Sequence, residues 1–119
     1  MYKFERLEVW ELSLQYIDML YNIAAQLPEH ELYNLYSQMT RAATSISLNI
    51  AEGSTGQTNT EQRRFLGMAM RSLIETVACL RLIERRGSLE KDTLENAILF
   101  SEKLFAKLAS FRKVIGKKV

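Results

Sequence analysis

The sequence has few of the residues that interrupt helices or build metal and disulfide sites. It contains one proline, one cysteine, one histidine and five glycines among 119 residues. The single cysteine, Cys79, excludes an internal disulfide and a cysteine-based metal site. The single histidine, His30, cannot supply the paired Glu-x-x-His motifs of a di-iron bundle. We therefore expect neither a metal centre nor a cofactor.

Long apolar runs and a strong charge of one sign are also missing. No stretch approaches the roughly 18 uncharged apolar residues of a membrane span. The first residues, M-Y-K-F-E-R-L-E-V-W, include acidic side chains and differ from a signal peptide. The net charge of +2 is too small to indicate nucleic-acid binding by itself. These absences predict a soluble, cytoplasmic protein with no membrane partner.

The residues that are abundant favour helices. Apolar residues make up 47% of the chain, and their spacing is helical, with no strand-like alternation. The helix-breaking residues Pro28, Gly53 and Gly87 separate four segments. Gly53 stands where a left-handed C-terminal cap is usual. We predict an all-α single domain over residues 1–119, an antiparallel up-down-up-down four-helix bundle with helices at approximately 7–26, 32–52, 61–86 and 90–115.

Apolar stripes predict the side chains that each helix directs into the core. The 7–26 stripe is Trp10, Ile17, Leu20, Tyr21, Ala24 and Leu27. The 61–86 stripe is Phe65, Ala69, Leu73, Val77, Leu80 and Ile83. The 90–115 stripe is Leu94, Ile98, Leu104, Phe105, Leu108, Phe111 and Ile115.

The segment 38–53 carries two stripes at helical period. The apolar stripe is Met39, Ala42, Ala43, Ile46 and Ile50, as a core face requires. At about 100° per residue, a second set of polar side chains falls within one arc of roughly 80° beside that face. This first polar ladder consists of Gln38, Arg41, Ser45, Asn49 and Glu52. Such order predicts a network buried against another helix or another subunit.

The segment 61–86 repeats this pattern. Its polar ladder consists of Glu61, Arg64, Ser72 and Glu75, with Arg71 at the margin. If the two helices are antiparallel, Asn49 lies near Arg64, and Arg41 near Ser72 and Glu75. Candidate ion pairs are then Arg41 with Glu75 and Glu52 with Arg64. The alternative is that exposed charges align by chance, in pairs worth about 0 to 1 kcal/mol.

The sequence shows no recognisable set of catalytic side chains. Cys79 has no histidine to activate it, and Ser45 and Ser72 also lack a base. The G-S-T-G sequence at 53–56 has neither the lysine nor the preceding strand of a phosphate-binding loop. We expect a protein that is not an enzyme.

Basic residues cluster at two places. Arg81, Arg85 and Arg86 lie near the end of the third predicted helix, and Arg71 is a further candidate. The outward side of the fourth predicted helix carries Lys103, Lys107, Lys113 and Lys117, followed by Lys118. Both clusters have a structural explanation. Cations near the C-terminus of a helix complement its dipole, and a row of lysines often covers a solvent-exposed face. In a ring of subunits, however, the repeated patches would favour a polyanion, bound through its backbone with weak sequence specificity.

Particular strings carry a family resemblance. S-I-S-L-N-I-A-E-G at 45–53 follows Q-M-T-R-A-A and precedes E-Q-R-R-F-L-G-M-A-M-R-S-L-I-E, with F-E-R-L-E-V-W at 4–10 and Leu-Pro-x-x-Glu at 27–31. The chain resembles the bacterial four-helix bundle family first noticed in intervening sequences of 23S ribosomal RNA genes. The resemblance marks as signature positions Gln38, Arg41, Ser45, Asn49, Glu52, Gly53, Glu61, Phe65, Ser72 and Glu75.

This resemblance implies a left-handed bundle that forms homopentameric rings. A related branch of the family serves as the accessory protein of diversity-generating retroelements, which binds a reverse transcriptase and nucleic acid. We therefore expect a homo-oligomer, a pentamer, with weak binding of RNA or DNA. The alternative is an interaction scaffold that docks a partner protein such as a reverse transcriptase.

Overall fold

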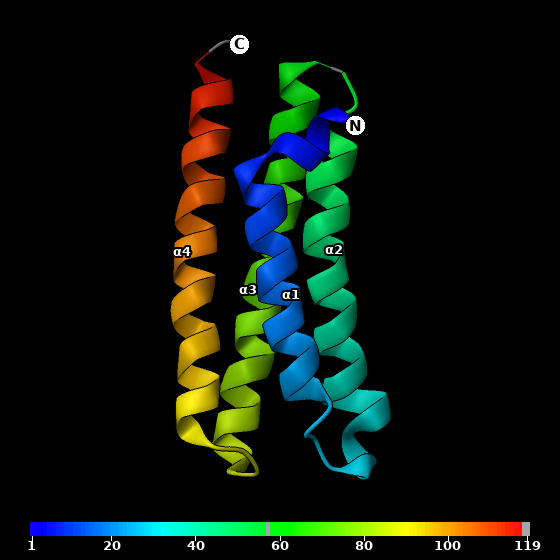
Figure 1. Cartoon of the computed structure of the whole chain (residues 1–119), viewed down its shortest axis with the longest axis vertical. Coiled ribbons are helices and arrows are strands. Elements are labelled where there is room, and N and C mark those ends of the chain that lie inside the picture. The colour runs from blue at the N-terminus through cyan, green and yellow to red at the C-terminus, as the bar shows by residue number, and fades with distance from the viewer. Residues whose placement is uncertain (57, 118–119) are drawn as a thin grey trace.

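The computed structural model describes residues 1–56 and 58–117, and within them all regular secondary structure is helical. Four long helices are present, which confirms the predicted all-α fold (Figure 1). They are α1 (Glu8–Ala24), α2 (Ser37–Gly53), α3 (Asn59–Arg86) and α4 (Lys91–Gly116). Three short elements accompany them: η1 (Lys3–Arg6), η2 (Glu29–Glu31) and η3 (Leu32–Tyr36), the last a single π-helical turn.

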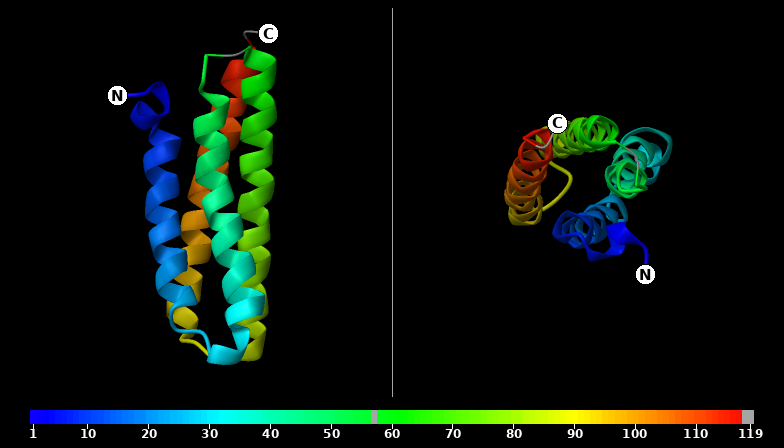
Figure 2. Two further views of the ribbon diagram at one scale, coloured as in Figure 1. Left: turned by 90° about the vertical axis from the view of Figure 1, so that its right-hand side faces the viewer. Right: turned by 90° about the horizontal axis from the view of Figure 1, so that it is seen from above.

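The four helices surround one long axis. Each packs against two neighbours, so that α1 and α3 each contact both α2 and α4. Consecutive helices run in opposite directions in Figure 1, and the view from above in Figure 2 shows them enclosing a common centre. The Cα atoms extend over 46 × 22 × 22 Å. The C-terminal end of α4 therefore lies beside the N-terminal end of α3.

Local hydrogen bonds move several helix boundaries from their predicted places. Thr58 caps α3 by accepting a hydrogen bond from the backbone of Glu61 at 3.1 Å, so α3 begins at Asn59 rather than 61. Before α2, the backbone N–H of Glu31 donates to the carbonyl of Pro28 at 2.9 Å. Residues 32–36, predicted as the first residues of the second helix, form the π-helical turn instead, and α2 begins at Ser37. Gly87 ends α3 with a φ of 71°, as expected for a left-handed cap.

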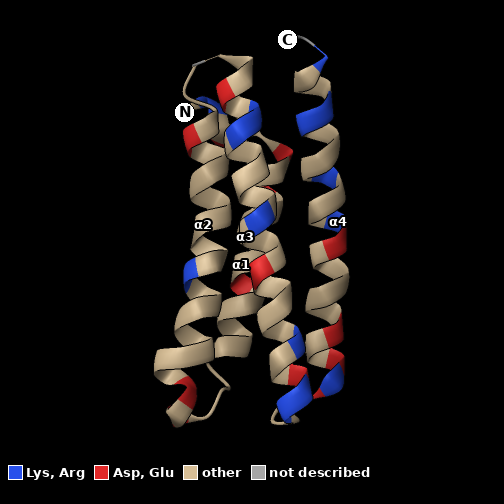
Figure 3. Ribbon diagram, turned by 180° about the vertical axis from the view of Figure 1, so that it is seen from behind, with Lys and Arg blue, Asp and Glu red and all other residues tan. Residues whose placement is uncertain are grey.

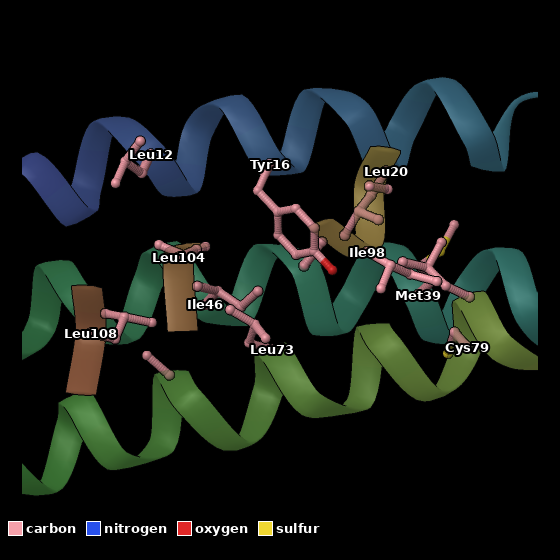
Figure 4. Close-up of a cluster of buried hydrophobic side chains, with 14 of the residues drawn as sticks. Leu12, Tyr16, Leu20, Met39, Ile46, Leu73, Cys79, Ile98, Leu104 and Leu108 are labelled. Carbon is pink, nitrogen blue, oxygen red and sulfur yellow. The ribbon is translucent and has the colours of Figure 1, made fainter. Parts of the chain in front are cut away.

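The core follows the predicted stripes on α2, whose five apolar members are all buried. On α1 the prediction is wrong at Tyr21, which is 42% exposed. The buried line of α1 instead runs through Leu12, Tyr16 and Leu20, which point into the centre in Figure 4. The prediction places Tyr21 in the core, but the tyrosine found there is Tyr16, five residues earlier in α1.

Tyr16 is fully buried, and hydroxyl groups satisfy its polar end. Its hydroxyl lies 2.7 Å from Thr76 Oγ1, and Thr76 in turn donates to the carbonyl of Leu73 at 2.6 Å. Because the Thr76 proton is used there, Tyr16 is the donor in the first bond. Burial raises the pKa of Tyr16 to about 12, against the opposing effect of the neighbouring hydroxyl groups of Thr76 and Ser101. The neutral phenol is therefore the form that this core accepts.

Replacing Tyr16 by phenylalanine should change how stability depends on pH. The ordinary pKa is 10.0 and the folded value about 12, so the folded protein holds this proton more tightly. The contribution is therefore complete below pH 10 and is lost as pH rises toward 12, by at most about 3 kcal/mol. We expect urea unfolding at pH 9 to 12 to show a shallower decline for Tyr16→Phe than for the wild type.

The same substitution should lower the free energy of unfolding at pH 7 by about 1 kcal/mol, because one buried hydrogen bond is lost. Tyr33→Phe is the matched control, since that side chain is 92% exposed. Identical pH profiles for the wild type and Tyr16→Phe would contradict the assignment.

Candidate functional site

The two polar ladders meet at their centres, on α2 and α3. The hydroxyl groups of Ser45 and Ser72 lie 2.9 Å apart across the two helices. Asn49 is only 7% exposed, and its Nδ2 donates to the carbonyl and hydroxyl oxygens of Ser45 at 2.8 and 3.0 Å. The structure thus brings together the small polar members of both ladders as one partly buried chain of hydrogen bonds.

The charged ends of the ladders are exposed and do not form the predicted ion pairs. Arg41 Nη2 donates instead to Ser37 Oγ, one turn back on its own helix, at 3.1 Å. Arg64 pairs with Glu61 at 3.1 Å, also on its own helix, so Glu52 is not its partner. Within one chain, the predicted pairs Arg41–Glu75 and Glu52–Arg64 are wrong. Such i,i+3 and i,i+4 partners are reached with less loss of side-chain freedom than a partner on another helix.

The unpaired charges border a surface hollow between α2 and α3. Arg41 and Glu75 both line this hollow of about 480 Å³, together with Gln38 and Tyr33. Tyr33 is 92% exposed. We call this region the α2/α3 hollow. It presents one cation, one carboxylate and one aromatic ring to the outside of the chain.

Gly53 has a different role from the predicted cap. It is the last residue of α2, and the described glycines with positive φ are Gly56 and Gly87. A Cβ at Gly53 would lie 2.8 Å from the Cβ of Phe65 on α3. The missing side chain therefore allows α2 and α3 to approach each other closely, just below the turn that joins them.

The predicted basic residues are exposed but do not form one patch. Arg81 is paired with Glu84 at 3.2 Å and approaches Glu95 at 3.9 Å, and Lys107 is paired with Glu8 at 3.3 Å. Arg85 and Arg86 end α3, whereas Lys113 and Lys117 end α4, and Figure 1 shows these ends at opposite poles of the bundle. Lys103 lies over the ring of Phe100 at 5.7 Å, Arg71 is exposed on α3, and Lys118 lies outside the described residues.

Cations without neighbouring carboxylates gather at one pole, between α3 and α4. A hollow of about 460 Å³ is lined there by four cationic side chains, over a floor that includes Met70 and Ala109. These cations are Arg63, Arg112, Lys113 and Lys117. Residues 103–117, which span the C-terminal half of α4 and its C-cap Lys117, contain no Asp or Glu, and Figure 3 shows this half of the helix marked only by basic residues. We call this region the α3/α4 groove.

The two arginines of the α3/α4 groove clasp each other's helices. Arg63 Nε donates to the carbonyl of Arg112 at 3.3 Å, and Arg112 Nε donates to the carbonyl of Arg63 at 2.9 Å. The residues four positions later are Gly67 and Gly116. In a helix, the side chain at i+4 lies near the carbonyl of residue i. A Cβ at Gly116 would lie only 2.8 Å from Arg63 Nε, so this glycine makes room for the Arg63 guanidinium, whereas a Cβ at Gly67 would lie 3.5 Å from Arg112 Nε, an ordinary contact.

Sequence reasoning missed Arg63 and Arg112. Neither residue receives a functional role from the sequence, although one sequence pattern points to them. The spacing Arg-x-x-x-Gly occurs on both helices, at 63–67 and at 112–116. Two such spacings on antiparallel neighbours permit reciprocal bonding, and this is the arrangement that the structure contains.

The remaining reactive groups do not form a site. Cys79 is buried, and burial, with a smaller effect of the nearby Glu75 charge, raises the pKa of its thiol. Across residues 1–56 and 58–117, no three His, Cys, Asp or Glu side chains gather as a metal site would require. In the same part of the chain, every helix is too short or too polar to cross a membrane.

Comparison with known proteins places the chain in a family. The profile of the family described as 23S rRNA-intervening sequence protein matches residues 5–110. The chain belongs to this family. No protein of curated function matches the chain. The family match covers both ladders and the clasp residues Arg63 and Gly67, but ends before Arg112.

A solved structure shares the fold. It is the crystal structure of a protein of unknown function from the S23 ribosomal protein family of Bacteroides thetaiotaomicron. The similarity covers 88% of this chain and 95% of that chain, with a TM-score of 0.80 and 24% sequence identity. At this identity the comparison supports the helical fold and carries no function across.

Substituting Gly53 by alanine should separate helices that now touch. We expect Gly53→Ala to lower the free energy of unfolding by about 1–3 kcal/mol, because the new methyl group meets the rigid base of the Phe65 side chain. Gly67→Ala is the control, since its Cβ would lie 3.5 Å from Arg112 Nε, an ordinary contact. Urea unfolding of both variants checks this, and equal stabilities would argue against the close approach.

Proposed function

We propose that this left-handed up-down-up-down bundle is a cytoplasmic, non-enzymatic protein that binds RNA or DNA through the phosphate backbone. The cationic lining of the α3/α4 groove carries the proposal. Its four cations border a single hollow with no carboxylate in the lining. A polyanion gains from such a surface by releasing its counterions, and the gain does not depend on sequence.

The groove also suits weak discrimination between sequences. Sequence-tolerant strand binding usually adds aromatic rings on which bases stack, each worth about 1–3 kcal/mol. The floor of this groove offers Met70 and Ala109 instead. Binding therefore depends on charge, and the affinity of one copy is low.

Assembly would multiply that affinity. We propose a homopentameric ring, in which the α2/α3 hollow of each subunit contacts the next subunit. Arg41 and Glu75 are exposed and carry opposite charges, and the largely exposed Tyr33 offers apolar area beside them. Five linked copies of the α3/α4 groove would bind one nucleic acid far more tightly than a single copy.

A second candidate function is docking of a partner protein, such as a reverse transcriptase. One observation favours it: Ile74, Leu82 and Leu99 on α3 and α4 are each more than half exposed. Pull-downs with and without nuclease separate the two functions. A purified partner that is retained after nuclease treatment supports docking, and a partner lost on treatment supports nucleic-acid binding.

Removing the groove lysines should weaken nucleic-acid binding and its salt dependence. We expect Lys113→Gln with Lys117→Gln to reduce the slope of log affinity against log salt by about 2, one for each phosphate contact. Fluorescence anisotropy with a labelled homopolymeric RNA between about 50 and 200 mM salt measures this.

The matched control is Arg85→Gln with Arg86→Gln, which removes the same charge at the opposite pole. If both double variants reduced the slope equally, the groove would not be the binding surface. Wild-type binding that is insensitive to salt would contradict the mechanism altogether.

Reversing the charges of the α2/α3 hollow should control assembly. We expect Arg41→Glu to raise the dissociation constant of the oligomer at least about tenfold, through like-charge repulsion across the boundary. Combining it with Glu75→Arg should restore much of the loss if the two residues pair between subunits. Sedimentation velocity at micromolar concentration measures both, with Glu102→Lys on α4 as the control. A monomeric wild type would refute the ring.

A further inference from the structure

We propose that the Arg63–Arg112 clasp is a phosphate subsite that holds one phosphate group of a bound polynucleotide. This inference rests on the proposed function and assigns it a specific anchor. The arginines and lysines of the groove carry the same charge, so charge alone gives the two guanidinium groups no special role. The argument depends on which of their N–H groups the protein already uses.

The clasp uses only the Nε atom of each arginine. Both Nε atoms donate to a carbonyl of the opposite helix, at 3.3 and 2.9 Å. A guanidinium group has five N–H donors, so four remain on the Nη atoms of each residue. The ion pairs among the described residues involve Arg64, Arg81 and Lys107, and neither clasp arginine takes part in them.

The Nε bonds also fix where the remaining donors lie. Each guanidinium is held against a glycine of the opposite helix: Arg63 lies over Gly116 and Arg112 over Gly67. Both residues line the same hollow. A planar group fixed in this way offers several donors to a tetrahedral anion without first losing side-chain freedom. A lysine cannot reproduce this arrangement, because its ammonium is a single point of charge.

The neighbouring cations favour a polynucleotide over an isolated ion. Lys113 and Lys117 are one turn apart on α4 and line the same hollow as the clasp. With a rise of 1.5 Å per residue, they extend the positive surface by about 6 Å along the helix. A row of cations beyond a fixed phosphate matches a chain of phosphates, which a free ion cannot satisfy.

Gly116 allows the clasp geometry to be changed without changing any charge. A Cβ at this position would lie 2.8 Å from Arg63 Nε and 3.1 Å from its Cζ. These atoms are at the end of a flexible side chain, so Gly116→Ala should displace the guanidinium and leave the helices in place. Gly67→Ala is the matched control, because its Cβ would meet Arg112 no closer than 3.5 Å.

The test follows the Nε–Hε NMR signals of Arg63 and Arg112, assigned with Arg63→Lys and Arg112→Lys. Inorganic phosphate and a short polyuridine RNA are added in separate titrations. We expect both signals to shift with both probes. Gly116→Ala should weaken phosphate binding about tenfold, the effect of losing charge-assisted hydrogen bonds, and Gly67→Ala less than about twofold. Circular dichroism melting confirms that both variants fold.

Two results would overturn the subsite. One is that phosphate shifts neither arginine signal, whatever RNA does. The other is that Gly116→Ala and Gly67→Ala weaken phosphate binding equally, which would make the guanidinium position irrelevant. If phosphate shifts both signals but the RNA does not bind, the anion site stands and the proposed function fails.

Discussion

Hydrogen bonds between helices fix the register of this bundle. Its apolar core supplies the driving force, but apolar burial is non-directional and would tolerate helices displaced along their axes. Directional contacts remove that freedom: Ser13 with Ser47 at 2.8 Å, Tyr16 with Thr76 at 2.7 Å, and Ser45 with Ser72 at 2.9 Å. Sliding α1, α2 or α3 by one turn would break at least one of these bonds. Displacing α1 or α3 would leave the buried hydroxyl of Tyr16 without its partner Thr76, at a cost of about 1–3 kcal/mol.

The same requirement shapes the α3/α4 groove. Its two helices are held at the cationic pole by the reciprocal bonds of Arg63 and Arg112, and Gly116 leaves the room that the Arg63 guanidinium needs. The structural bonds use the inner nitrogen of each side chain and leave the outer nitrogens for a ligand. Stability and the proposed binding therefore do not compete for the same donors, because each arginine serves both through different atoms.

Periodicity predicted the helices well because burial of one face is a strong constraint over fifteen or more residues. It failed at Tyr21 because a tyrosine, with its apolar ring and polar hydroxyl, fits either face of a helix. Tyr16 is spaced four residues from both Leu12 and Leu20 on the buried side of α1, and its hydroxyl finds a partner in Thr76. The cross-helix ion pairs failed for another reason. A charge on a surface helix takes the nearest partner, as Arg64 does with Glu61, and spacing along one helix cannot exclude this.

The charges of the two hollows suit different partners. The α2/α3 hollow is lined by Arg41 from α2 and Glu75 from α3, so in a head-to-tail ring Arg41 of one subunit can lie beside Glu75 of the next. The α3/α4 groove presents only cations, and two copies of it repel each other. In an assembly held together by the α2/α3 hollow, charge repulsion therefore disfavours any contact between two α3/α4 grooves. In the proposed ring, the cationic groove of every subunit would then face solvent, where a polyanion could reach it.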